Sequence, residues 1–208
     1  MRLAIFGATG GTGLELTRQA LEHGHSVRVL LRNPNRMPLA NANMRVVLGN
    51  VFDQQSVTKT LLGTDAALNC LGQRNLLRNT HVVSVGTRLI MDVMKAHGLR
   101  RLVVESAFGA GDSLAHTTMF GRLFLSTVLW APYQDKNLME PAVISSGLDW
   151  TILRPTRLTN GPRTDRYQVF RDRQPPVPSV SRADVAAAML RAVEERLWIG
   201  EAMAVTGA

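Results

Sequence analysis

The chain has 208 residues, of which 45% are hydrophobic and 19% charged, and it contains one cysteine, Cys70. That apolar content excludes a disordered chain, one cysteine excludes a disulfide scaffold, and the sequence has no run of about 18 apolar residues that would predict a membrane span. The 24 Lys and Arg residues outnumber the 16 Asp and Glu residues, but they form no basic tail, so phosphate-bearing small ligands account for them without nucleic acid.

The first half of the chain alternates apolar runs with segments of helical spacing. Residues 1–6 enter a strand directly and lack the features of a signal peptide, which predicts a cytoplasmic protein. The apolar runs predict buried strands at residues 2–6, 26–31, 44–48, 66–71 and 102–105. Helical spacing predicts helices at about 14–21, 55–62 and 82–96, the last with an apolar stripe of Val82, Val85, Leu89 and Val93.

The second half is less regular. A helical region is predicted at 114–145, a strand at 150–153, a helix at 182–195 that Ser181 caps, and a final strand at about 201–206. Strands and helices that alternate through short loops are typical of an open parallel sheet with helices on both faces. The sequence therefore predicts a single α/β domain over residues 1–208, with a doubly wound, Rossmann-like sheet.

The first predicted strand runs directly into a glycine-rich loop, Gly-Ala-Thr-Gly-Gly-Thr-Gly at residues 7–13, and then into a helix. Backbone N–H groups at a helix N-terminus bind the phosphates of a dinucleotide. In this pattern Gly7 permits the tight turn, Gly10 lets the backbone approach the phosphates, and Gly13 lets the helix pack on the strand. An ordinary glycine-rich turn is the alternative, but the position after the first strand favours dinucleotide binding.

The end of the second predicted strand indicates which dinucleotide is bound. An acidic residue there suits the free ribose hydroxyls of NAD, whereas arginine suits the 2′-phosphate of NADP. The chain has Arg32 and Arg36 at this point, and no acidic residue between Glu22 and Asp53. Two solvated surface arginines are the alternative, but two guanidinium groups on one turn favour NADP(H) as cofactor.

Several segments are similar to a known family. The glycine loop, Leu-Leu-Arg-Asn-x-x-Arg at 30–36, Leu-Gly-Asn-Val-Phe-Asp at 48–53 and Leu-Asp-Trp-Thr-Ile-Leu-Arg-Pro at 148–155 resemble the NmrA-like atypical short-chain dehydrogenase/reductases. Leu-Gly-Gln-Arg-Asn at 71–75, Met-Lys-Ala-His-Gly-Leu at 94–99 and Val-Val-Glu-Ser-Ala-Phe at 103–108 resemble the biliverdin-IXβ reductase/flavin reductase group more narrowly. The resemblance covers most of the chain and is loosest at 111–145.

This resemblance implies an NADPH-dependent reductase that transfers a hydride to a flavin or bilin-like acceptor. It implies a catalytic role for Ser106, an aromatic substrate wall at Phe108, and a substrate cleft formed by about residues 106–180. Trp130 lies on a stretch that could belong to the core or cover that cleft, and we assign it to the substrate. The implied cofactor-binding residues are Gly7, Thr9, Gly10, Gly11, Thr12 and Gly13 at the diphosphate, Arg32 and Arg36 at the 2′-phosphate, Asn50 and Val51 at adenine, and Leu71, Gly72 and Arg74 at the nicotinamide ribose.

The chain departs from the wider family at one important place. The Tyr-x-x-x-Lys pair of short-chain dehydrogenases is missing, because Tyr133 lies three residues before Lys136 and not four. We interpret Lys136 and Glu140, four residues apart, as an ion pair on the surface of a helix. Reduction of a ketone needs a placed proton donor, whereas a flavin or bilin delocalises the incoming charge over its own nitrogens. Ser106 either orients the substrate or relays a proton, or it only ties down the end of a strand.

Other interpretations remain open. The protein could be an NADP-binding redox sensor without turnover, or a carbonyl or sugar reductase or epimerase. The basic stretch at 154–173 could line an anionic substrate pocket or be a solvated loop. The five histidines show no metal-ligand spacing, so no metal site is predicted, and Cys70 is expected to be an inert buried thiol. The oligomeric state is open, with a monomer favoured.

Overall fold

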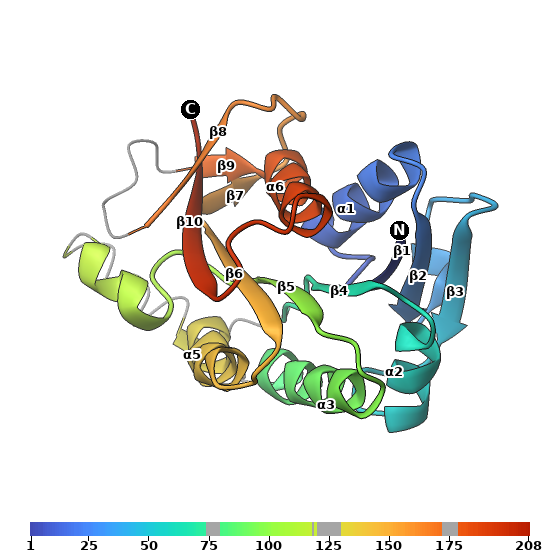
Figure 1. Cartoon of the computed structure of the whole chain (residues 1–208). Helices are drawn as coiled ribbons and strands as arrows, with labels where there is room; N and C mark the ends of the chain where they lie inside the picture. The colour runs from blue at the N-terminus through green and yellow to red at the C-terminus, as the bar shows by residue number, and fades with distance from the viewer. Residues whose placement is uncertain (74–79, 118, 120–129, 172–178) are drawn as a thin grey trace.

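A computed structural model of the chain describes residues 1–208 except 74–79, 118, 120–129 and 172–178 (Figure 1). In the described residues an eight-stranded sheet runs through the centre, in the order β3-β2-β1-β4-β5-β6-β10-β8. Neighbouring strands are parallel except for β8, which is antiparallel to β10 at one edge. The strands are β1 (Arg2–Phe6), β2 (Ser26–Leu31), β3 (Met44–Leu48), β4 (Ala66–Asn69), β5 (Arg101–Glu105), β6 (Asp149–Pro155), β8 (Tyr167–Phe170) and β10 (Glu201–Gly207).

Helices cover both faces of this sheet (Figure 1). Helices α1 (Gly11–Glu22) and α6 (Arg182–Glu194) pack on one face, and α2 (Gln54–Leu61), α3 (Val82–Ala96) and α5 (Trp130–Ile144) pack on the other. Side chains of β1 alternate between the two cores, with Leu3 and Ile5 beneath α1 and α6, and Phe6 on the opposite side. Burial on both faces explains why the strands are continuous apolar runs. The predicted doubly wound α/β fold is confirmed.

Three short strands were not predicted. β8 forms the antiparallel edge, and β7 (Arg157–Thr159) pairs in parallel with β9 (Ser179–Ser181) as a separate two-stranded sheet. Each has only three or four residues, too few for a period of two to be recognised. The predicted helical region at 114–145 is described as a 3₁₀ turn at Gly111–His116 and α5, and part of it lies outside the described residues.

The predicted apolar stripe of α3 is wrong at one of its four positions. Val85 is 48% exposed, whereas Val93 is buried and Val82 and Leu89 pack against the core. The buried side of the helix also carries Val83, Thr87, Ile90 and Met94. The buried side also makes a polar contact, because Asn69 Nδ2 at the end of β4 donates a hydrogen bond of 2.7 Å to Thr87 Oγ1.

The same asparagine ends β4 two residues earlier than predicted. The N–H of Leu71 donates to Asn69 Oδ1 at 3.0 Å, which turns the chain out of the sheet. Residues 70–72 therefore form a loop at the end of β4 rather than part of a strand.

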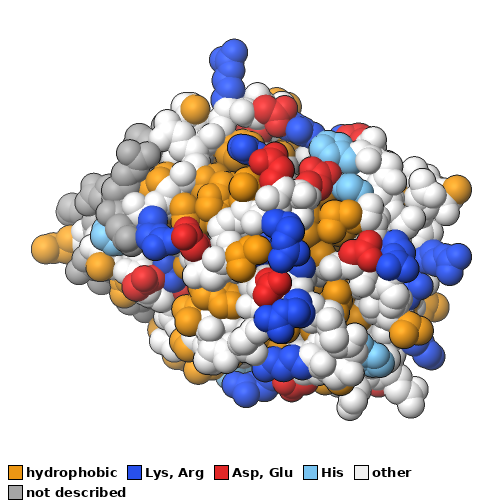
Figure 2. Space-filling model, in the orientation of Figure 1, with side chains coloured by type: hydrophobic (Ala, Val, Ile, Leu, Met, Phe, Trp, Pro, Cys, Tyr) orange, Lys and Arg blue, Asp and Glu red, His pale blue; other side chains and the backbone are white. Residues whose placement is uncertain are grey.

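Basic and acidic side chains are interspersed on the surface. On the face in Figure 2, Lys and Arg side chains lie next to Asp and Glu side chains and form no continuous basic area. In the described part of the chain, every helix is too short or too polar to cross a bilayer.

Candidate functional site

A large cavity lies at the carboxyl ends of the central strands, where the strand order reverses between β1 and β4. Open α/β sheets bind their ligands at such a point. The cavity has a volume of about 1620 Å³, larger than a typical single-ligand pocket. It brings together most of the residues predicted from the sequence: Gly7, Thr9, Gly10, Gly11, Thr12, Gly13, Arg32, Arg36, Asn50, Val51, Leu71, Gly72, Ser106 and Phe108.

Two predicted residues are not among the described lining. Arg74 lies outside the described residues. Trp130 is the first residue of α5 and is exposed. Pro132, Tyr133 and Lys136 form the side of α5 that faces the cavity, and helical geometry turns Trp130 about a third of a turn away from that side. The assignment of Trp130 to the substrate pocket is therefore not supported by its position.

The glycine loop has the shape that a diphosphate requires. Gly7 has a φ of 80°, and a side chain there would collide with the carbonyl of Cys70. A side chain on Gly13 would collide with the carbonyl of Gly7, so α1 lies directly against the end of β1. Gly10 is the N-cap of helix α1 and offers no side-chain cap, and the first turn of the helix has no acidic residue. Its N-terminal N–H groups thus suit an anion.

The cavity continues past the glycine loop to the end of β2. Arg32 follows this strand, and Arg36 ends a 3₁₀ turn at Pro34–Arg36 that the side chain of Asn33 caps. Both arginines are exposed and line the cavity. The side chain of Asn50 stabilises the turn in which it lies, because its Oδ1 accepts a hydrogen bond from the N–H of Phe52 at 3.2 Å. This end of the cavity therefore offers two cationic side chains for a phosphate.

Ser106 and Phe108 lie at the other end of the cavity, just after β5. Their backbone N–H groups donate to the carbonyls of Leu153 and Pro155 at 2.7 and 2.8 Å, which fixes this segment to β6. Ser106 is only 2% exposed, and its Oγ has no hydrogen-bond partner among the described residues. The backbone, rather than the serine hydroxyl, thus holds the end of the strand in place.

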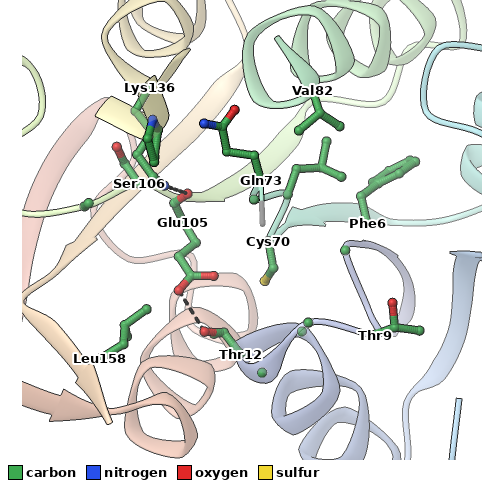
Figure 3. Close-up of a pocket in the computed structure, with 18 of the residues that line it drawn as sticks. Phe6, Thr9, Thr12, Cys70, Gln73, Val82, Glu105, Ser106, Lys136 and Leu158 are labelled. Atoms are coloured by element: carbon green, nitrogen blue, oxygen red, sulfur yellow. Dashed lines mark hydrogen bonds between the residues drawn. The ribbon is translucent and has the colours of Figure 1, made fainter. Parts of the chain in front are cut away.

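A buried acid that the sequence reading missed lies in the floor of the cavity. Glu105 Oε1 accepts a hydrogen bond of 2.8 Å from Thr12 Oγ1 in the glycine loop (Figure 3). Burial raises the pKa of the Glu105 carboxyl, although the nearby positive charges of Lys136 and Arg182 act in the opposite direction. Burial and the neighbouring Glu105 raise the pKa of the Cys70 thiol well above its usual range, which agrees with an inert thiol.

Helix α5 contributes two further polar side chains to the cavity. Lys136 Nζ donates to the backbone carbonyl of Glu105 at 3.3 Å (Figure 3), and loss of solvent lowers the pKa of Lys136. The Tyr133 hydroxyl donates to the carbonyl of Phe108 at 2.8 Å, and burial raises the pKa of Tyr133 to about 12. The predicted surface pair of Lys136 with Glu140 is therefore wrong, because Lys136 faces the cavity and Glu140 is buried elsewhere.

Glu140 instead binds Arg154, the first arginine of the basic stretch at 154–173. Arg154 donates from Nε and Nη2 to the two carboxylate oxygens of Glu140 at 3.1 and 2.6 Å, and both side chains are buried. Asp112 forms a second ion pair with Arg154. Arg154 is thus structural, whereas Arg157 is exposed and lines the cavity.

A second polar cluster lies outside the described lining of the cavity. One carboxylate oxygen of Glu194, at the end of α6, accepts from His23 Nδ1 at 2.9 Å and His25 Nε2 at 2.6 Å. These ligand-type atoms lie within 4.8 Å of one another. Spacing along the chain could not reveal the cluster, because Glu194 is 169 residues from His25.

Known proteins share this sequence pattern and fold. The NAD(P)H-binding family matches residues 7–196. The chain is 29% identical to (4-alkanoyl-5-oxo-2,5-dihydrofuran-3-yl)methyl phosphate reductase of Streptomyces griseus, over 99% of this chain and 67% of that protein. It is 23% identical to probable pinoresinol-lariciresinol reductase 3 of Arabidopsis thaliana over 93% of this chain, and it spans 63% of that protein's length.

The fold is also found in solved structures. The anaerobillin reductase ChuY of Escherichia coli O157:H7 has a TM-score of 0.84 and 23% identity, over 100% of this chain and 97% of that one. At this identity the likeness shows the fold alone. The family match, the reversed strand order and the uncapped glycine loop agree with one another. The chain binds NAD(P)H and belongs to the NAD(P)H-binding family.

Proposed function

We propose that the protein is an NADPH-dependent reductase that passes a hydride to a flat, conjugated, anionic acceptor such as a flavin nucleotide or a bilin. The observation that carries this proposal is the buried Ser106 hydroxyl, which lines the cavity and has no partner among the described residues. Buried polar atoms in native proteins are nearly always hydrogen-bonded. A bound acceptor would supply the partner that Ser106 lacks.

The cofactor half of the proposal rests on the two ends of the cavity. The uncapped start of α1 would hold the diphosphate, and Arg32 and Arg36 would pair with the 2′-phosphate, which favours NADP(H) over NAD(H). The bound nicotinamide supplies the hydride. Leu71 and Gly72, at the end of β4, would lie along the adjoining ribose.

The acceptor half rests on what remains of the lining beyond Ser106. Phe108, Pro132 and Leu158 supply apolar walls suited to a flat ring system, and the exposed Arg157 supplies a positive charge at the same end. Such a site favours a conjugated molecule that carries carboxylates or phosphates. The Escherichia coli neighbour is named an anaerobillin reductase and the Streptomyces relative a (4-alkanoyl-5-oxo-2,5-dihydrofuran-3-yl)methyl phosphate reductase, and the phosphate in the second name supports an anionic acceptor.

The polar groups of the cavity suit this chemistry better than carbonyl reduction. A tyrosine that protonates an alkoxide needs a lowered pKa, whereas the pKa of Tyr133 is raised to about 12 and its proton is donated to a backbone carbonyl. Ser106 Oγ would donate a hydrogen bond to an acceptor heteroatom and hold a proton there. Lys136 would keep that end of the cavity positive, which favours the negative charge that arrives with the hydride.

Turnover distinguishes this proposal from a redox sensor. Purified protein is mixed with NADPH and either riboflavin phosphate or biliverdin, and the nicotinamide absorbance is followed. We expect loss of NADPH that depends on the acceptor, is reduced in Ser106→Ala and is unchanged in Ser145→Ala. Ser145 is a matched control because it is exposed and lies in the turn that follows α5. Tight NADPH binding without acceptor-dependent loss for any conjugated acceptor would support the sensor instead.

A further inference from the structure

Arg182 approaches the glycine loop from the far end of the chain. It is the first residue of α6 and follows Ser181, which ends β9 and caps the helix by accepting from the N–H of Asp184 at 3.0 Å. The side chain of Arg182 lines the cavity together with Gly10, Gly11 and Thr12. The small sheet of β7 and β9 thus positions the guanidinium of Arg182 near the start of α1.

Gly11 shows how closely the two segments meet. A side chain on Gly11 would collide with Cδ of Arg182 and lie 2.7 Å from its Nε. Gly11 is the first residue of α1 and does not have a positive φ, so its backbone conformation would accept other residues. The absence of a side chain at this position therefore makes room for the stem of Arg182.

The guanidinium is held in place but not neutralised. Arg182 Nη1 donates to the neutral side chain of Asn160 at 2.6 Å. No carboxylate of the described residues lies within ion-pair distance of Arg182, although its charge lowers the pKa of the Glu105 carboxyl in the cavity floor.

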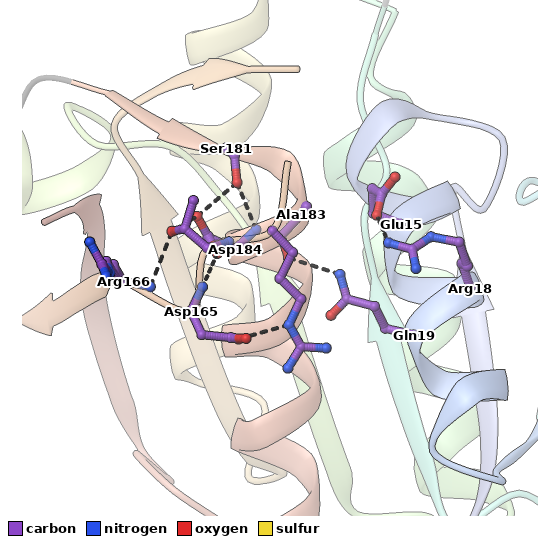
Figure 4. Close-up of polar contacts among 10 residues, drawn as sticks. Glu15, Arg18, Gln19, Asp165, Arg166, Ser181, Ala183 and Asp184 are labelled. Atoms are coloured by element: carbon purple, nitrogen blue, oxygen red, sulfur yellow. Dashed lines mark hydrogen bonds and ion pairs between the residues drawn. The ribbon is translucent and has the colours of Figure 1, made fainter. Parts of the chain in front are cut away.

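The loop after β7, which starts at Asn160, is itself anchored to the start of α6. Asp184 accepts from the N–H of Thr164 at 2.8 Å and from that of Asp165 at 2.9 Å, and it also binds Ser181 Oγ at 2.9 Å (Figure 4). Asp184 is buried, so these bonds are shielded from solvent. Arg182 and its tether are therefore positioned before any ligand arrives.

We propose that Arg182 pairs with the diphosphate of the dinucleotide beside the glycine loop, at the start of α1. The loop's N–H groups and the guanidinium would then bind the diphosphate together, each bond assisted by charge. The diphosphate is common to both dinucleotides, so Arg182 contributes affinity without discriminating between them. Discrimination would remain with Arg32 and Arg36. The inference rests on dinucleotide binding and not on the acceptor of the proposed reduction.

The test is a calorimetric titration with NADP⁺, NAD⁺ and adenosine 2′-monophosphate, without any acceptor. Arg182→Gln should weaken NADP⁺ and NAD⁺ by the same factor, about 10- to 100-fold, and leave adenosine 2′-monophosphate unchanged because that molecule has no diphosphate. Arg182→Lys, which keeps the charge, should recover part of the loss. The control is Arg191→Gln on the exposed side of the same helix, which should change nothing.

Three results would overturn the inference. Unchanged binding of NADP⁺ by Arg182→Gln would show that the guanidinium does not reach the diphosphate. A loss confined to NADP⁺ would assign Arg182 to the 2′-phosphate, and an equal loss for all three molecules would indicate a general disturbance of the fold. Because no acceptor is present, failure to reduce a flavin or bilin would leave these titrations unaffected and would count only against the proposed function.

Discussion

Replacing Glu140 with Ala should destabilise the protein by about 3–5 kcal/mol, because it leaves a buried guanidinium without its main partner. Glu140 is 1% exposed and Arg154 is 5% exposed. Their paired contacts, at 3.1 and 2.6 Å, satisfy both oxygens of the carboxylate. The other partner of Arg154, Asp112, has a side chain that is 79% exposed, so solvent screens its contribution.

Urea unfolding without dinucleotide measures this loss, since a bound ligand would add stability of its own. With a slope of about 2–3 kcal/mol per molar urea, the midpoint should fall by roughly 1–2.5 M. Glu195→Ala, which removes an exposed pair with Arg191, should cost no more than about 0.5 kcal/mol.

The double variant Glu140→Leu with Arg154→Met separates charge from packing. It removes both buried charges and should recover most of the stability lost in Glu140→Ala. The reasoning would be refuted if Glu140→Ala were no worse than Glu195→Ala. It would also fail if the double variant were as unstable as the single one, because the loss would then come from packing and not from an unpaired charge.

Three further predictions concern the cavity. Arg32→Ala with Arg36→Ala should weaken NADP⁺ by about 10- to 100-fold in calorimetry and leave NAD⁺ nearly unchanged, and an equal loss for both would contradict their assignment to the 2′-phosphate. Ser106→Ala should lower turnover by about 100-fold or more. Its melting temperature should not fall, since the hydroxyl has no described partner to lose; undiminished turnover would remove its role. Burial raises the pKa of Glu105, so its carboxylate forms as the pH rises through that raised pKa and then repels the diphosphate. Wild-type affinity for NADP⁺ should therefore fall as the pH rises through that raised pKa, and Glu105→Gln should flatten the profile; a flat wild-type profile would disprove the coupling.

The nucleotide end of the site was predictable because the sequence patterns that form it are local. The glycines of residues 7–13 and the arginines after β2 each act within a few positions of a strand end, and strand ends follow from apolar runs. All of these predicted residues line the cavity. Their roles toward the cofactor stay predictions that the titrations above test.

The reactive end was only partly predictable, because its contacts are long-range. Glu105 meets Thr12 across 93 positions, and Lys136 meets Glu105 across 31. The spacing of Lys136 and Glu140 suggested a pair on the surface, but that rule assumes a solvated helix face. The ion pair of Glu140 with Arg154 could not be inferred from spacing within one helix.

The first helix of the chain rests against its last described helix. Gln19 Nε2 in α1 donates to the carbonyl of Ala183 in α6 at 2.9 Å, across 164 positions of the sequence (Figure 4). Because this contact joins residues so far apart in the sequence, the support beneath the phosphate-binding turn needs residues from both ends of the described chain. A nascent chain with only its amino-terminal half exposed carries the binding sequence without this scaffold. A coenzyme that binds only the folded chain should therefore raise the stability of that state.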